Sequence, residues 1–157
     1  MSETGTEDSV GNVLPALRAA RRHASLAVLC TGVAGASGLC LLFALVLLTT
    51  GEWMFNLAIG LPGLLYDTIL IALSMGVRRG RFIWLTMILL GFGVFGAAYA
   101  VVIAVWGAWA VAFWGALLPV GILGCLQLVS MMLLIRVLLV STGDKRVRET
   151  AKGMGDR

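Results

Sequence analysis

The sequence predicts an all-α integral membrane protein whose four transmembrane helices form two in-out-in hairpins, with both termini in the cytoplasm. Three observations predict this class. Of the 157 residues, 60% are hydrophobic and only 13% are charged, whereas roughly a quarter of the residues in a soluble domain are charged. The apolar residues form four runs of 20 or more residues, and a helix needs ~20 residues to cross a bilayer. All 12 lysines and arginines can be placed on one side of these runs.

The N-terminal segment, residues 1–23, is polar and begins with acidic residues, so its start is expected to be disordered. From Val10 onward, apolar residues recur at positions i, i+3, i+4 and i+7, which is the pattern of a short amphipathic helix at the membrane interface. Pro15 fits such a helix only if the helix starts near Asn12. A flexible basic lead-in to the membrane is the alternative interpretation. The recurring residues are Val10, Val13, Leu14 and Leu17.

The predicted transmembrane bundle occupies residues 24–141, and the tail that follows, 142–157, is basic and cytoplasmic. No alternation of period two is visible in the apolar runs, which argues against strands. The segments outside them are too short to form a core, since even ~40 residues is marginal. Cys30, Cys40 and Cys125 are expected to be buried as small apolar residues. The four spans are predicted at about 26–49, 53–77, 82–105 and 110–140.

The basic residues set the predicted orientation. The two loops on the opposite side, "TTGEW" and "WGAWA", contain no lysine or arginine, and short loops follow the positive-inside rule closely. The net charge of +4 then indicates attraction to anionic lipid, at ~1 kcal/mol per basic residue, and not nucleic-acid binding. The expected inner-leaflet contacts are Arg18, Arg21, Arg22, Arg78, Arg79, Arg81, Arg136, Lys145, Arg146 and Arg148. An Arg-, Ala- and Gly-rich composition with only two lysines further indicates the cytoplasmic membrane of a bacterium with a GC-rich genome.

The second span carries a stripe of polar and glycine residues. Projected on a helix, the stripe covers an arc of ~60°, and its glycines allow another backbone to approach. Tyr66 lies outside the stripe. Pro62 cannot donate a hydrogen bond, so a kink is predicted there. The residues of the stripe are Asn56, Gly60, Gly63, Asp67 and Ser74.

Asp67 is the main candidate functional residue, because an aspartate near mid-membrane costs ~2.5–3.5 kcal/mol on insertion scales. Gln127, with Ser130 nearby, is one candidate hydrogen-bond partner on the fourth span. Arg136 is another, although it is expected to extend to the inner interface. Three roles remain open for Asp67: a neutral hydrogen-bonding group that fixes helix packing, a contact between subunits, or a group on a proton or cation path.

Small residues on the other spans predict close helix packing, either within one bundle or with another protein. The first span carries Ser25, Gly32, Gly35 and Ala36 on one side. The third span carries a longer stripe, and the fourth a shorter patch that Gln127 adjoins. The residues of these two sets are Thr86, Gly93, Gly96, Ala97, Ala100 and Ala104, and Gly121, Gly124 and Cys125.

No catalytic residues, metal site or cofactor are predicted, because the one histidine, His23, lies at the membrane edge and no nucleotide-binding or zinc motif occurs. The predicted function is a small non-enzymatic accessory, scaffold or assembly subunit of a larger membrane complex. The alternatives are a small oligomeric transporter or a cation or proton channel that uses Asp67, and a holin-like pore. The expected partners are the lipid bilayer and other membrane subunits or further copies of this chain. In size and topology the chain resembles four-span families such as the small multidrug transporters, whose essential glutamate lies in the first helix, where this chain has no acid.

Overall fold

The computed structural model describes residues 4–49, 54, 60–106 and 110–155, and the side chains of 15–44, 47–48, 54, 60–99, 102 and 120–143. All regular secondary structure in this part of the chain is helical, which confirms the predicted all-α fold. Four long helices are present: α1 (Thr4–Thr49), α3 (Leu61–Arg78), α4 (Ile83–Trp106) and α5 (Ala110–Gly155).

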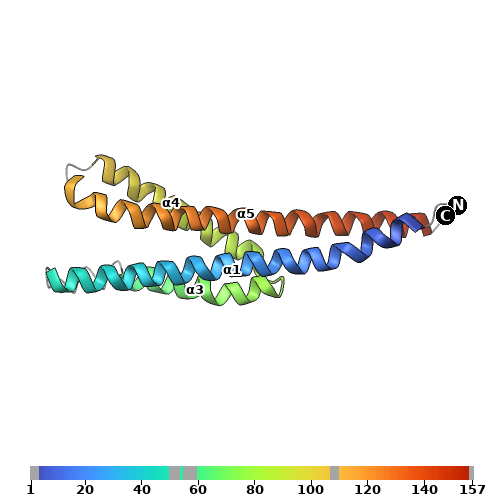
Figure 1. The fold of residues 1–157 in the computed structure, drawn as a ribbon, viewed down its shortest axis with the longest axis horizontal. Coiled ribbons are helices and arrows are strands. Elements are labelled where there is room, and N and C mark those ends of the chain that lie inside the picture. Colours follow the sequence, from blue (N-terminus) through green and yellow to red (C-terminus); the bar gives the residue numbers. More distant parts are fainter. Residues whose placement is uncertain (1–3, 50–53, 55–59, 107–109, 156–157) are drawn as a thin grey trace.

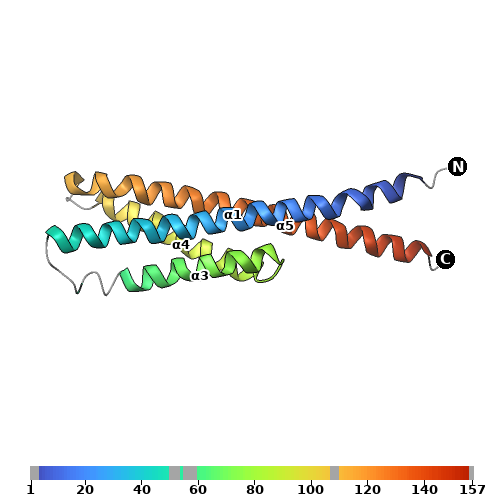
Figure 2. The ribbon, with the colours of Figure 1, turned by 60° about the horizontal axis from the view of Figure 1, so that its bottom comes forward.

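The helices form an elongated bundle in which α1 and α5 are central (Figure 1). α1 packs along both α3 and α5, α4 packs along α5, and α3 has only a small contact with α4. Figures 1 and 2 both place the two chain termini at the same end of the long axis. The α3–α4 turn lies toward that end, short of the termini.

The turn from α3 to α4 is tightly hydrogen-bonded. The amide of Gly80 donates to the carbonyl of Val77 over 2.9 Å, and the amide of Arg81 donates to that of Gly76 over 2.8 Å. Gly80 has a φ of 74°, a left-handed conformation that glycine adopts without steric cost. The carbonyls at the end of α3 are thereby satisfied.

α1 and α5 extend beyond the predicted spans. Each has 46 residues, so the described residues of the expected N-terminal segment and basic tail continue the same helices as the apolar runs. A change from apolar to charged residues changes the surroundings of a helix but not its backbone preference, since Arg, Lys, Glu and Ala are all good helix formers. Pro15 lies inside α1, and α1 bends in its N-terminal third (Figure 1), as a proline requires.

Pro62 lies near the start of α3 as the structure describes this helix. α3 begins at Leu61, so Pro62 occupies the first turn of the helix. An amide in the first turn has no partner within the helix, and the fixed φ of proline suits this position. The predicted kink stays a prediction, because residues 55–59, which precede Pro62 in the expected helix, lie outside the described part of the chain.

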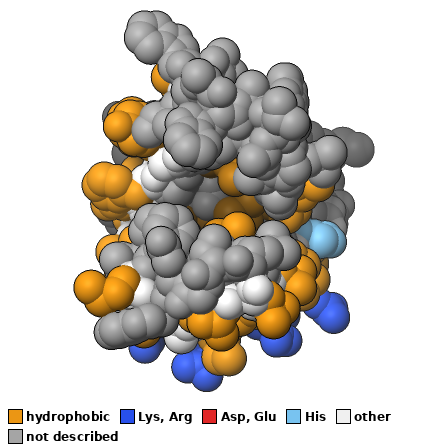
Figure 3. All heavy atoms as spheres, turned by 90° about the vertical axis from the view of Figure 1, so that its left-hand side faces the viewer, with side chains coloured by type: hydrophobic (Ala, Val, Ile, Leu, Met, Phe, Trp, Pro, Cys, Tyr) orange, Lys and Arg blue, Asp and Glu red, His pale blue; other side chains and the backbone are white. Residues whose placement is uncertain are grey.

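Among the residues whose side chains are described, three helices are long and apolar enough to cross a membrane, over Pro15–Ala44, Leu61–Arg78 and Val120–Gly143. The corresponding apolar stretch of α4 with described side chains, Ile83–Tyr99, is shorter. Seen along the bundle from the end at which α1 terminates, the described hydrophobic side chains lie around the outside (Figure 3). By length and surface composition these are the helices of a membrane protein.

The core of the described part is small and lies between all four helices. It contains eight buried hydrophobic residues: Leu17, Ala24, Val28, Leu70, Val77, Leu90, Leu134 and Val137. The cysteines do not belong to it, because Cys30, Cys40 and Cys125 are all exposed on the outside of the bundle. Their expected burial was wrong: an apolar residue on a membrane helix is equally well placed against lipid.

Candidate functional site

The stripe of α3 packs directly on α1. The hydroxyl of Ser25 donates to the carbonyl of Ser74 over 2.8 Å, and this bond fixes one end of the contact. Toward the other end, Gly63 leaves room for Leu39 and Gly60 for Phe43 of α1. We call this set the α1–α3 contact face. Asn56 lies outside the described residues.

Asp67 lies in the middle of the α1–α3 contact face and is only 3% exposed. Its carboxyl group occupies the space next to Gly35, where a Cβ would stand 2.7 Å from the Asp67 Cγ. One turn away, a Cβ at Gly32 would be 3.0 Å from the Asp67 carbonyl. The two glycines of α1 therefore make room for both the side chain and the backbone of Asp67.

No hydrogen bond or ion pair joins Asp67 to another residue that the structure describes. The expected partner Gln127 lies instead beside Gly93 of α4, and Arg136 lies in a hollow next to Ala19 and His23 of α1. Gly35 is twelve residues further along α1 than His23, which corresponds to ~18 Å. The structure forms neither the Asp67–Gln127 nor the Asp67–Arg136 pair.

Gln127 and Tyr66 meet at Gly93. A Cβ on Gly93 would fall on the Tyr66 hydroxyl and on the amide of Gln127, whose Cδ is 2.9 Å from that position. The Tyr66 hydroxyl donates to the carbonyl of Leu89 in α4 over 2.9 Å. Gln127 is 2% exposed, and its Oε1 accepts no hydrogen bond from the described residues. A buried polar atom without a partner destabilises the fold.

Ser130 connects α5 to α1. Its hydroxyl lies 2.9 Å from the hydroxyl of Thr31, and both side chains are fully buried. The Thr31 hydroxyl also lies 2.9 Å from the carbonyl of Ala27 in its own helix. Interhelical hydrogen bonds of this type stabilise membrane bundles modestly, by ~0.6 kcal/mol on average.

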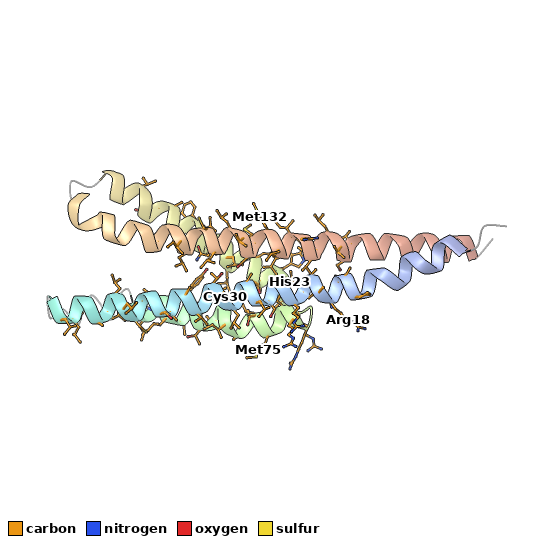
Figure 4. All side chains as sticks on the ribbon, viewed as in Figure 1. Arg18, His23, Cys30, Met75 and Met132 are labelled. Carbon is orange, nitrogen blue, oxygen red and sulfur yellow. The ribbon has the colours of Figure 1, made fainter. Side chains whose placement is uncertain are left out.

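The arginines of α1 and of the α3–α4 turn gather where the four-helix part of the bundle ends, at the α3–α4 turn; we call this the basic end of the bundle. Figure 4 shows side-chain nitrogens grouped between the labelled Met75 of α3 and Arg18 of α1. The guanidinium of Arg21 lies over the turn, with its Cζ 2.7 Å from where a Cβ of Gly80 would stand. The positive φ of Gly80 favours glycine at this position, whereas the flexible tip of the Arg21 side chain can move aside. Lys145, Arg146 and Arg148 lie on the helical backbone of α5, and their side chains lie outside the described set.

Two polar contacts are not evident from the sequence. The helical projection puts Tyr66 outside the stripe, yet its hydroxyl reaches α4, because a tyrosine is long enough to cross to a helix other than the one its Cα faces. Thr31 is not part of the small-residue face predicted for the first span. Its position one turn from Gly35 on α1 nevertheless indicates that it can face another helix. Two glycines predicted to pack, Gly96 and Gly121, have no described atom within 4 Å of the place where a Cβ would stand.

No family model, curated protein or solved structure matches this chain. The inferences below therefore depend on its own residues. Among those described, the buried polar groups lie at helix contacts and Asp67 is the one acidic side chain. The arrangement can hold helices together and can present cations at one end; within the described part of the chain it brings together no nucleophile with a base.

Proposed function

We propose that the chain is a four-span protein of a bacterial cytoplasmic membrane, with both termini in the cytoplasm. α4 has 24 residues, or ~36 Å, which exceeds the ~30 Å hydrocarbon layer. The arginines of α1 and of the α3–α4 turn lie toward the end that carries both termini. The positive-inside rule assigns this end to the cytoplasm.

Within that membrane the proposed role is a non-enzymatic accessory or assembly subunit that binds another membrane protein. The observation that carries this proposal is the outward face of α4. Its large exposed hydrophobic side chains fall within an arc of ~120° on the helix, opposite the buried Thr86 and Leu90. They are Trp84, Leu85, Ile88, Phe92, Phe95, Tyr99 and Val102.

α4 is also the least enclosed helix of the bundle. It packs mainly on α5 and has only a small contact with α3. Gly96 lies one turn from Phe92 at the edge of the outward face, with no described atom within 4 Å of its Cβ position. A glycine beside large aromatic side chains forms a notch that a partner helix can enter, and close packing of this kind drives helix association in lipid.

The geometry gives less support to a transporter or channel that uses Asp67. A proton or ion path needs a carboxyl group that water or the ion can reach, whereas this carboxyl group is enclosed by Gly35 at a helix contact. The four hollows described on the protein are not lined by Asp67. A holin-like pore is a further alternative, which predicts toxicity on overexpression.

Native mass spectrometry after extraction in mild detergent tests the accessory role. The wild-type chain is expected in a complex with a different membrane protein, and Phe92→Ala with Phe95→Ala is expected to lose that partner. The matched control is Val129→Ala with Met132→Ala, two exposed residues of α5, and it is expected to retain the partner. A stable monomer or simple dimer of the wild-type chain would contradict the proposal.

Reconstitution into liposomes tests the rival. If Asp67 carries ions or protons, the wild-type protein dissipates an imposed gradient and Asp67→Asn abolishes this flux without unfolding the protein. The accessory role predicts no flux that depends on Asp67. The Phe92→Ala/Phe95→Ala variant tests the contact on α4, and Asp67→Asn tests a path for ions or protons through Asp67.

A further inference from the structure

A hollow of ≈ 670 Å³ lies between α1 and α3 at the basic end of the bundle. An adjoining hollow of ≈ 500 Å³ shares Arg22 and Leu26 with it and continues along α1 to Arg18 and His23. The first hollow combines three cations with apolar side chains. It is lined by Arg22, Ser25, Leu26, Leu29, Ser74, Met75, Arg78 and Arg79.

Polarity changes in the same direction along both walls of this hollow. On α1, Arg22 is followed by Leu26 and Leu29, which lie on the same face at i+4 and i+7. On α3, which runs antiparallel, Met75 precedes Arg78 and Arg79. Both walls are therefore cationic at the end of the bundle and apolar toward its middle. A phospholipid with an anionic headgroup matches this arrangement, because its charged group lies at one end and its acyl chain extends from it.

The floor of the hollow is closed and its frame is fixed. Ser25 and Ser74 are buried, and their hydrogen bond of 2.8 Å joins the two helices beneath the hollow. The Arg79 amide donates to the carbonyl of Gly76 over 3.1 Å, and Arg21 lies over the turn at Gly80. The hydrogen bonds of the turn thus fix the backbone at Arg79, next to Arg78.

The three guanidinium groups have no carboxylate partner among the described residues. Asp67 is the only acidic residue with a described side chain, and it is buried against Gly35 on the same two helices, further from the basic end. Leu26 is 50% and Met75 is 66% exposed, so the apolar walls are open as well. The ligand that fits must supply negative charge and hydrocarbon together.

We propose that this hollow binds one anionic phospholipid from the leaflet at the basic end. Arg22, Arg78 and Arg79 bind its phosphate, for which the planar guanidinium fork is well suited. Its acyl chain lies along Leu26, Leu29 and Met75. Basic pockets between membrane helices bind anionic lipid headgroups in this way. The proposal depends on the membrane placement given above.

Native mass spectrometry of the purified protein, titrated with phosphatidylglycerol or phosphatidylcholine, tests the site. One phosphatidylglycerol is expected to be retained, in preference to phosphatidylcholine. Arg22→Gln is expected to weaken this retention about fivefold, and the triple variant with Arg78→Gln and Arg79→Gln ~100-fold. Circular dichroism checks that the variants are folded. If the triple variant is unfolded, the retention measured for Arg22→Gln alone tests the site.

The control carries three substitutions at other arginines: Arg18→Gln, Arg81→Gln and Arg136→Gln. Its net charge therefore equals that of the triple variant. It is expected to retain phosphatidylglycerol nearly as the wild type does. An equal loss in the control would mean diffuse attraction to the bilayer and would overturn the site. Displacement of the lipid by an equal concentration of glycerol phosphate would overturn it too, because the headgroup alone would then account for binding.

Met75→Trp tests the apolar wall, because the larger side chain fills the hollow and leaves the arginines in place. It is expected to lose phosphatidylglycerol, and unchanged retention would overturn the proposed path of the acyl chain. Carbonate extraction of the wild-type protein from phosphatidylcholine vesicles separates the two proposals. Failure to insert overturns the membrane placement and this site together, whereas insertion without preference for phosphatidylglycerol overturns the site alone.

Discussion

The carboxyl group of Asp67 in α3 lies against the backbone of Gly35 in α1, in the space that a Cβ at position 35 would need. The one acidic residue of α3 is thereby enclosed next to a glycine of α1. The contact explains how a carboxyl group can be 3% exposed in an apolar bundle. It also makes position 35 the most direct test of the packing.

Gly35→Ala is expected to destabilise the protein, because the added methyl group collides with the Asp67 carboxyl group. Overpacking of this kind typically costs about 1–3 kcal/mol. Thermal unfolding in detergent measures the effect. Gly38→Ala is the matched control, since nothing lies within 4 Å of its Cβ position on the same helix. Equal stability of the two variants would show that the α1–α3 contact is not formed as described.

Thr31→Val and Ser130→Ala are expected to show energetic coupling, because they remove the two ends of one hydrogen bond between α1 and α5. A double-mutant cycle should give a coupling energy of ~0.6 kcal/mol. Thr68→Val is the control, because its exposed hydroxyl bonds only to Leu64 in its own helix. Additive effects of Thr31→Val and Ser130→Ala would exclude this bond.

Gln127→Met is expected to leave stability unchanged or to raise it. The Oε1 of Gln127 is buried without a hydrogen-bond partner among the described residues, and such an atom costs about 1–3 kcal/mol. Methionine is unbranched and similar in shape, so the site stays filled. Denaturation of the two proteins in the same detergent measures the difference. A clear loss of stability would mean that the amide of Gln127 makes a contact that packing alone does not replace.

Reporter fusions are expected to place the C-terminal end of the chain in the cytoplasm and residue 108 on the opposite side of the membrane. A fluorescent protein that folds only in the cytoplasm should be active when it is fused after residue 157, whereas a phosphatase that folds only outside should be inactive there. Fusions that truncate the chain after residue 108 should give the opposite result, because α4 then ends on the outer side. The same result at both positions would rule out α4 as a span.

The all-helical fold and the ends of α4 follow from local features of the sequence. Apolar runs of span length require internally bonded backbone in lipid, and only the helix is compatible with this pattern. The polar positions of α3 also follow from helical period alone. They lie on one face because Gly60, Gly63, Asp67 and Ser74 are three, four and seven residues apart.

The tertiary structure alone decided what that face meets. Asp67 contacts Gly35, and Gln127 contacts Tyr66 and Gly93. These contacts depend on how far each helix is shifted along its axis and how it is rotated, and both are set by segments that are far apart in the chain. The tertiary structure also separated the glycines that pack from those that do not, such as Gly35 from Gly96. A sequence marks where a backbone can be approached closely, but which neighbour approaches it is a property of the packed helices.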